Sequence, residues 1–151
     1  MIYWDTACVL KLYTTEPDSA AYLRLAEQST EPVASSEILG VELAFALHQK
    51  ELRGELKPGG AERLRQQFMT DVAAGRWLLA PVGTDVLTRA IHIAQKCFHR
   101  RPPLSLRTLD GIHLATALVL KARHVVSTDQ RLRQTAVLLG LTLLSPEEKQ
   151  S

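Results

Sequence analysis

The sequence predicts an α/β domain with a largely parallel sheet that is covered by helices on both faces. Short apolar runs alternate along the chain with longer stretches that have helical periodicity, which is the element order of parallel α/β domains. The short runs are almost continuously apolar, as strands are when both faces of their sheet are buried. At 151 residues, the chain has the length of one domain and can bury roughly two thirds of its unfolded surface.

Each expected element is assigned from its own pattern. "MIYWD" is a first strand that runs into a helix, and "PVASS" is a short strand that leads into the apolar helix containing "ILGVELAFAL". "RWLLAPV", "HVVST" and "LTLLS" have the same short apolar pattern, and helical periodicity fills most of the intervening chain. The expected strands are 1–5, 32–36, 76–82, 124–128 and 141–145, and the expected helices are 7–13, 16–28, 38–53, 58–75, 84–98, 108–122 and 129–140.

Polar residues and glycines mark several helix ends. Asp18 is the expected cap of the second helix, and Thr84 or Asp85 is the expected cap of the fifth, because short polar side chains accept hydrogen bonds from free backbone N–H groups. Gly54 and Gly140 follow the third and the last helix, at the position where glycine is favoured.

The composition of 46% hydrophobic and 23% charged residues is ordinary for a globular protein. No run approaches the roughly 18 apolar residues of a membrane span, and the N-terminus lacks the features of a signal peptide, so a cytoplasmic location is expected. Cys8 and Cys97 form no CxxC pair and no disulfide framework, which fits a reducing compartment, and both are expected in the core. We expect a single domain over 1–146 and a polar C-terminal tail at 147–151.

Positive charge is concentrated in one segment. The formal net charge is only +2, but residues 86–128 contain seven Lys or Arg, four of the five histidines and a single acid, Asp110. Within this segment the paired prolines of "HRRPPLSLR" cannot continue a helix, so 99–107 is expected to be a loop. The segment can form a face that meets phosphates. Alternatively, it is a solvated surface whose charge is balanced by acids elsewhere in the fold.

Four acids are placed where sites form in parallel sheets. Asp5 ends the first strand and Asp129 follows the fourth, so both lie along the carboxyl edge of the sheet. Glu42 lies inside the helix that leaves the second strand, and Asp110 lies in the first turn of the helix that enters the fourth. Each acid has a structural alternative. These are a helix cap for the two that follow strands, a dipole-stabilised first-turn acid for Asp110, and a solvent-facing stripe for Glu42.

Glu42 is the least expected of these acids because apolar residues surround it in "ILGVELAFAL". An unpaired ionised carboxylate is costly in an apolar setting. Converging carboxylates also repel one another unless cations hold them, and oxygen ligands without His or Cys favour Mg²⁺ or Mn²⁺. Two such ions about 4 Å apart can activate a water and stabilise the leaving oxygen of a phosphodiester. We therefore predict that the four acids are metal ligands with a catalytic role.

Four segments resemble the PIN domain, and most closely the VapC-type toxins of toxin–antitoxin pairs: "MIYWDTACVLKLY", "SSEILGVELAFAL", "LRTLDGIHLATAL" and "VVSTDQRL". The resemblance covers nearly the whole chain and implies a three-layer α/β/α fold with a mainly parallel central sheet. It also implies an acidic quartet that binds Mg²⁺ or Mn²⁺ and hydrolyses RNA, an inhibitory antitoxin partner and a homodimer. By resemblance, that quartet is Asp5, Glu42, Asp110 and Asp129.

The resemblance implies supporting roles for four further residues: Thr6, Ser36, His113 and Thr128. The hydroxyls have an alternative role in turns or caps, and His113 has an alternative role as a packed, hydrogen-bonded core histidine. Two positions depart from the family pattern. Ala7 replaces a common Ser or Asn, and Gly111 replaces the more usual Ala or Ser, which weakens its helix.

Arg100, Arg101 and Arg107 precede Asp110 in an acid-free loop and are expected to position the RNA backbone. Two other functions stay open. One is a PIN-domain nuclease of RNA or DNA processing outside toxin–antitoxin pairs, and the other is a PIN module that binds RNA without cutting it. No Gly-rich phosphate loop or zinc-ligand spacing is present, which disfavours nucleotide-binding and zinc enzymes.

Overall fold

The computed structural model describes residues 1–146; the tail expected at 147–151 lies outside this range. The described residues form a five-stranded sheet in the order β3-β2-β1-β4-β5, with every neighbouring pair parallel. The strands are β1 (Ile2–Trp4), β2 (Val33–Ser36), β3 (Leu78–Ala80), β4 (His124–Val126) and β5 (Thr142–Leu144). The predicted parallel α/β fold is therefore confirmed.

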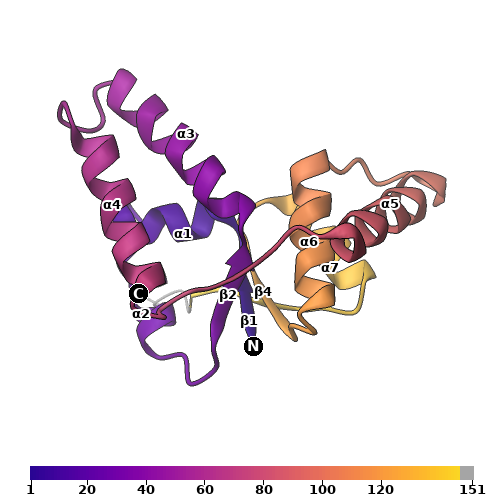
Figure 1. Cartoon of the computed structure of the whole chain (residues 1–151). Coiled ribbons are helices and arrows are strands. Elements are labelled where there is room, and N and C mark those ends of the chain that lie inside the picture. Colours follow the sequence, from indigo (N-terminus) through magenta and orange to yellow (C-terminus); the bar gives the residue numbers. More distant parts are fainter. Residues whose placement is uncertain (147–151) are drawn as a thin grey trace, which may run out of the picture.

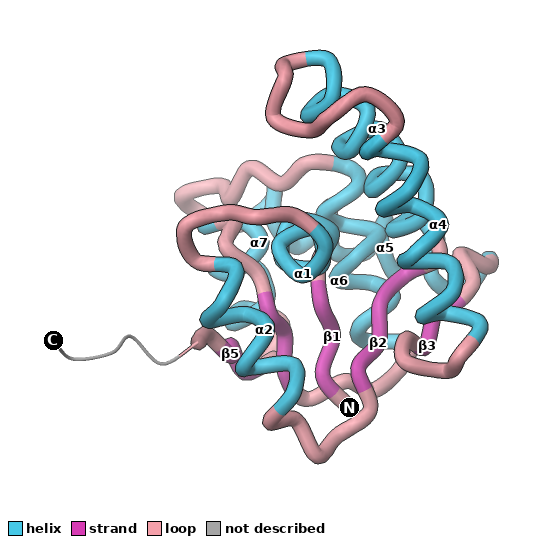
Figure 2. The backbone as a smooth tube through the Cα atoms, turned by 90° about the vertical axis from the view of Figure 1, so that its left-hand side faces the viewer, coloured by secondary structure: helices cyan, strands magenta, loops and turns pink. Residues whose placement is uncertain are grey.

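Helices cover both faces of this sheet (Figures 1 and 2). They are α1 (Thr6–Tyr13), α2 (Ser19–Glu27), α3 (Ile38–Leu52), α4 (Gly60–Ala73), α5 (Thr84–His99), α6 (Thr108–Val119) and α7 (Gln130–Leu138). α1 to α4 pack on one face, and α5 to α7 pack on the other. Figure 1 shows the α3–α4 pair projecting on one side of the strands and α5 to α7 gathered on the opposite side. The result is the three-layer α/β/α arrangement. No helix within the described residues combines the length and apolar character needed to cross a bilayer.

The alternation of side chains along the central strand separates two apolar cores. Ile2 and Trp4 of β1 belong to the core beneath α1 to α4, whereas Tyr3 belongs to the core beneath α5 to α7. This follows from the two-residue period of a strand. Cys8 and Cys97 are fully buried, one in each core, as expected for free cysteines.

Two expected helix caps differ in the structure. Asp18 stands at the N-cap position of α2, but its side chain makes no capping hydrogen bond and instead pairs with Lys11 at 2.8 Å. The expected cap of α5 is wrong, because Gly83 is the N-cap residue and Thr84 begins the helix, with Asp85 in its first turn. Glycine substitutes for a polar cap at a cost of only a few tenths of a kcal/mol, so the cap position is not set by a polar side chain here.

Replacing Gly111 with alanine is expected to raise the free energy of unfolding by about 0.5–1 kcal/mol, because glycine is unfavourable inside a helix. A Cβ atom at this position would meet Leu106 Cδ2 at 3.7 Å, which is ordinary van der Waals contact. Urea denaturation measures the change. The matched control is Gly54→Ala, since Gly54 has a φ of 78° after α3 and alanine is strained there. A destabilised Gly111→Ala protein would contradict this packing.

Candidate active site

The carboxyl ends of the strands open onto a cavity of about 500 Å³. All four predicted acids line it, although they come from four separate segments of the chain. The lining residues are Asp5, Thr6, Ala7, Leu10, Glu42, Ala46, Arg107, Asp110, His113, Thr128 and Asp129. Loops and helix starts that follow parallel strands meet at this edge of the sheet, which explains the convergence.

Asp5 is almost fully buried between β1 and α1. It caps α1, since its Oδ1 accepts a hydrogen bond from the backbone N–H of Cys8 at 2.9 Å, and its Oδ2 accepts one from the hydroxyl of Ser127. Burial raises the pKa of Asp5, although the hydrogen bonds from Ser127 and Cys8 oppose this shift. The Asp5 side chain therefore both caps α1 and lines the cavity.

Glu42 projects from α3 into a cluster of polar side chains. Its Oε2 accepts a hydrogen bond from the hydroxyl of Thr6 at 2.6 Å and lies 2.6 Å from Nε2 of His113. Thr6 Oγ1 also lies 3.2 Å from the same His113 nitrogen. Burial alone would raise the pKa of Glu42, but the hydrogen bonds from His113 and Thr6 leave it below its ordinary value. Glu42 is therefore held as a carboxylate, as a metal ligand must be.

Arg107 links the two remaining acids. Its Nε donates to Asp110 Oδ2 at 2.9 Å, and its Nη2 donates to Asp129 Oδ2 at 3.0 Å. The other oxygen of Asp129 caps α7 by accepting from two backbone N–H groups. The Arg107 side chain is itself 66% exposed, so its position depends on these two ion pairs and not on packing.

The cavity combines several negative charges with one close cation. As the side chains stand, no three His, Cys, Asp or Glu side chains within residues 1–146 are close enough to hold one metal ion together. The positive charge between Asp110 and Asp129 is the guanidinium of Arg107. All four acids offer carboxylate oxygens, so the donor set is chemically suited to a hard divalent ion.

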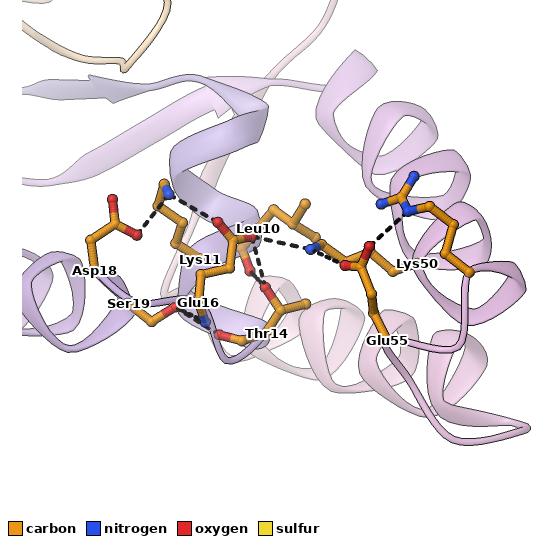
Figure 3. A network of polar contacts seen from close by, with 9 residues as sticks. Leu10, Lys11, Thr14, Glu16, Asp18, Ser19, Lys50 and Glu55 are labelled. Atoms are coloured by element: carbon orange, nitrogen blue, oxygen red, sulfur yellow. Dashed lines mark hydrogen bonds and ion pairs between the residues drawn. The ribbon is translucent and has the colours of Figure 1, made fainter.

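A polar network links α1 to α3, the two helices that carry Thr6 and Glu42 (Figure 3). Glu16 pairs with Lys11 of α1 at 2.9 Å and with Lys50 of α3 at 3.4 Å. Lys11 also pairs with Asp18, and Lys50 pairs with Glu55. Burial would raise the pKa of Glu16, but Lys11 and Lys50 lower it. The contacts join the α1–α2 turn to the C-terminal end of α3.

The structure divides the other predicted site residues into two groups. Thr6, His113, Thr128 and Arg107 line the cavity. Ser36 is buried away from it and accepts a long hydrogen bond, 3.5 Å, from the backbone N–H of Ile38 at the start of α3. Arg100 and Arg101 are exposed in the α5–α6 loop and do not line the cavity, and the guanidinium of Arg101 contacts backbone carbonyls of residues 98–100.

Two residues in the site were not predicted from the sequence. Ser127 bonds Asp5 through its hydroxyl and accepts from the backbone N–H of Asp129 at 3.1 Å, so it connects two acids. Tyr3 contacts Nδ1 of His113 at 2.7 Å. A hydroxyl inside an otherwise apolar strand was a usable signal for Tyr3. Ser127 and Thr128 are neighbours in the sequence, and the sequence does not show which of their two hydroxyls faces Asp5.

Comparison with known proteins identifies the family. The model of the PIN domain matches residues 2–138. The chain belongs to the PIN-domain family. Over 96% of its length this PIN domain is 33% identical to ribonuclease VapC46 of Mycobacterium tuberculosis (strain ATCC 25618 / H37Rv), of which the match covers 97%. The resemblance found in the sequence is therefore confirmed.

Solved structures share the fold of this PIN domain. A chain of a toxin–antitoxin complex from Klebsiella pneumoniae superposes with a TM-score of 0.65 at 18% identity, covering 98% of this chain and 99% of that one. A chain of FitAcB from Neisseria gonorrhoeae gives 0.66 at 19% identity, with 97% and 98% covered. A chain of VapBC2 from Rickettsia felis, bound to a promoter DNA fragment, gives 0.63 at 17% identity, with 95% and 98% covered.

Proposed function

We propose that this PIN domain is a Mg²⁺- or Mn²⁺-dependent endoribonuclease that hydrolyses RNA phosphodiesters with two metal ions, and that it is the toxin of a VapC-type pair. The observation that carries the proposal is the convergence of four acids on one cavity, two of them around a single cation. Its 33% identity to a VapC ribonuclease along almost the whole chain adds support.

The ligands of this site would be Asp5, Glu42, Asp110 and Asp129. A bound Mg²⁺ or Mn²⁺ would lower the pKa of a water and neutralise charge on the leaving oxygen. The protein's own part is to orient the carboxylates. Thr6 and His113 orient Glu42 and keep its pKa low, and the Ser127 hydroxyl orients Asp5 and opposes the rise in pKa that burial causes there. Hydrogen-bonded neighbours of this kind raise metal affinity because they orient the ligand oxygens.

Arg107 has a second role in this scheme. It must release at least one of its acids when a metal ion takes its place, and its exposed side chain is free to move. A guanidinium released beside the cavity can bind phosphate oxygens in a bidentate manner. Arg107 would then hold the RNA backbone next to the site, while Arg100 and Arg101 would contribute charge further along the α5–α6 loop.

Purified protein is expected to cut single-stranded or loop RNA with Mg²⁺ or Mn²⁺, to lose cleavage in EDTA and to regain it when excess metal is restored. The physical reason is that the water becomes a nucleophile at neutral pH only beside a metal. Gel analysis of end-labelled RNA measures this, and a DNA strand of the same sequence distinguishes a nuclease of broader substrate range. Full cleavage in EDTA would exclude a metal-dependent mechanism. RNA binding without metal and without any cleavage would favour a PIN module that binds RNA but does not cut it.

We also propose that an antitoxin segment covers the apolar outer surface of α3. Val41, Phe45 and Leu52 are 61%, 68% and 88% exposed, and a hollow of about 300 Å³ beside Phe45 is lined almost wholly by apolar atoms. The same helix carries Glu42, so a segment bound here reaches the cavity within a few residues. A basic side chain on it would pair with the carboxylates and compete with metal. The homodimer implied by the resemblance stays a prediction.

A further inference from the structure

A buried chain of close polar contacts leads from β1 to the side of the cavity that Glu42 lines. The Tyr3 hydroxyl lies 2.7 Å from Nδ1 of His113, and the rings meet edge to face with centroids 5.9 Å apart. Nε2 of the same histidine lies 2.6 Å from Oε2 of Glu42. Tyr3 and His113 are 1% and 2% exposed, so water has little access to either ring.

The protons of this chain of contacts can be assigned from its two ends. A tyrosine phenol has an ordinary pKa of about 10, so at neutral pH Tyr3 keeps its proton and can donate it to the ring nitrogen 2.7 Å away. At the other end, an ionised carboxylate only accepts hydrogen bonds. A proton on Nε2 therefore gives two good hydrogen bonds, Tyr3 O–H to Nδ1 and Nε2–H to Glu42. A proton on Nδ1 alone would instead bring the Nε2 lone pair against the carboxylate at 2.6 Å.

With this proton arrangement, the two oxygens of the Glu42 carboxylate have different roles. Oε2 receives hydrogen bonds from both His113 and Thr6. Oε1 has no hydrogen-bond partner among residues 1–146, and Glu42 lines the cavity. One oxygen is thus anchored from two directions, and the other is left available.

We propose that Tyr3 is a positioning residue, which holds His113 as the Nε2–H tautomer so that Oε2 of Glu42 is anchored and Oε1 is presented as a ligand. The proposal deepens the proposed function and rests on it for the identity of the ligand. The hydrogen bond from the second ring nitrogen is what sets the tautomer of a functional histidine.

The first test is the tautomer itself, observed in the metal-free full-length chain. Two-bond ¹H–¹⁵N spectra should show His113 with a protonated Nε2 and a hydrogen-bonded, unprotonated Nδ1. In Tyr3→Phe the Nδ1 signal should move toward that of a mixed tautomer. The matched control is Tyr13→Phe, which also removes a phenol hydroxyl with hydrogen bonds, to Asp71 and Trp77, and should leave the His113 signals unchanged. An Nδ1–H tautomer or an imidazolium in the wild type would overturn the proposal, as would unchanged signals in Tyr3→Phe.

The second test is metal affinity without RNA, measured by the electron paramagnetic resonance signal of free Mn²⁺. Loss of an orienting partner typically costs 10–100-fold in metal affinity, so Tyr3→Phe should weaken Mn²⁺ binding by about tenfold and Tyr13→Phe should not weaken it. A shifted tautomer with unchanged Mn²⁺ affinity would overturn the positioning role. A wild-type protein that binds no Mn²⁺ would instead remove the proposed function, while the tautomer measurement would still decide what Tyr3 does to His113.

Discussion

Changing Glu42 to Gln or Asp110 to Asn is expected to reduce metal-dependent RNA cleavage by at least about 100-fold, since a direct ligand should matter more than its neighbours do. The melting temperature should change by no more than about 4 °C. In Glu42→Gln the new amide keeps an oxygen that can accept from Thr6 and His113. In Asp110→Asn the guanidinium of Arg107 keeps its pair with the remaining aspartate.

The matched control for these amides is Glu51→Gln on the same helix as Glu42. The Glu51 side chain accepts hydrogen bonds from the backbone N–H groups of Gly59 and Ala61, outside the cavity. Cleavage by this variant should equal that of the wild type. A loss of many degrees in melting temperature for each of the cavity amides would support a structural role for the acids, and unchanged cleavage would exclude them as ligands.

Expression of the chain alone is expected to stop bacterial growth, because an uninhibited ribonuclease degrades the RNA of its host. The Asp129→Asn variant should allow growth. Asparagine caps helices as well as aspartate does, so the start of α7 is preserved while the proposed metal ligand loses its charge. Colony counts after induction, with matched protein levels on immunoblots, measure the difference, which should reach several orders of magnitude. Equal toxicity of both proteins would show that the toxicity does not depend on the carboxylate of Asp129 in the cavity.

Co-expression with the product of the neighbouring gene extends this experiment. If that product is the antitoxin, it should restore growth and purify as a complex, and raising Mg²⁺ should weaken its inhibition of RNA cleavage. Phe45→Glu should weaken the complex without lowering cleavage, since Phe45 is exposed on α3 and does not line the cavity. An absence of toxicity together with no complex would leave a metal-dependent nuclease of another pathway as the better assignment.

The fold and the convergence of the acids could be predicted because they depend on short-range pattern and on strand direction. Apolar runs indicated the strands, and the rule that parallel strands end at one edge brought Asp5 and Asp129 together. The strand order was not predictable in the same way. It depends on which strands pair across the sheet, and the pattern of a single run does not identify its neighbours.

The details of the site depend on contacts between residues distant in sequence. Arg107 was assigned to RNA because its own loop is basic, whereas its partner Asp129 stands 22 residues later. His113 shows the opposite case, since its packed, hydrogen-bonded environment was one of two stated possibilities. In the structure the buried ring also contacts Glu42, so packing and site chemistry are combined.

Crystals soaked in MnCl₂ would show whether the four carboxylates hold divalent metal. We expect anomalous scattering from manganese inside the cavity, at coordinating distance from Glu42 and Asp110, with the guanidinium of Arg107 moved from at least one of its two aspartates. Crystals of Asp110→Asn treated in the same way should show much weaker manganese density. A wild-type map with no manganese in the cavity, and with Arg107 still bridging Asp110 and Asp129 at saturating metal, would exclude these carboxylates as a metal site.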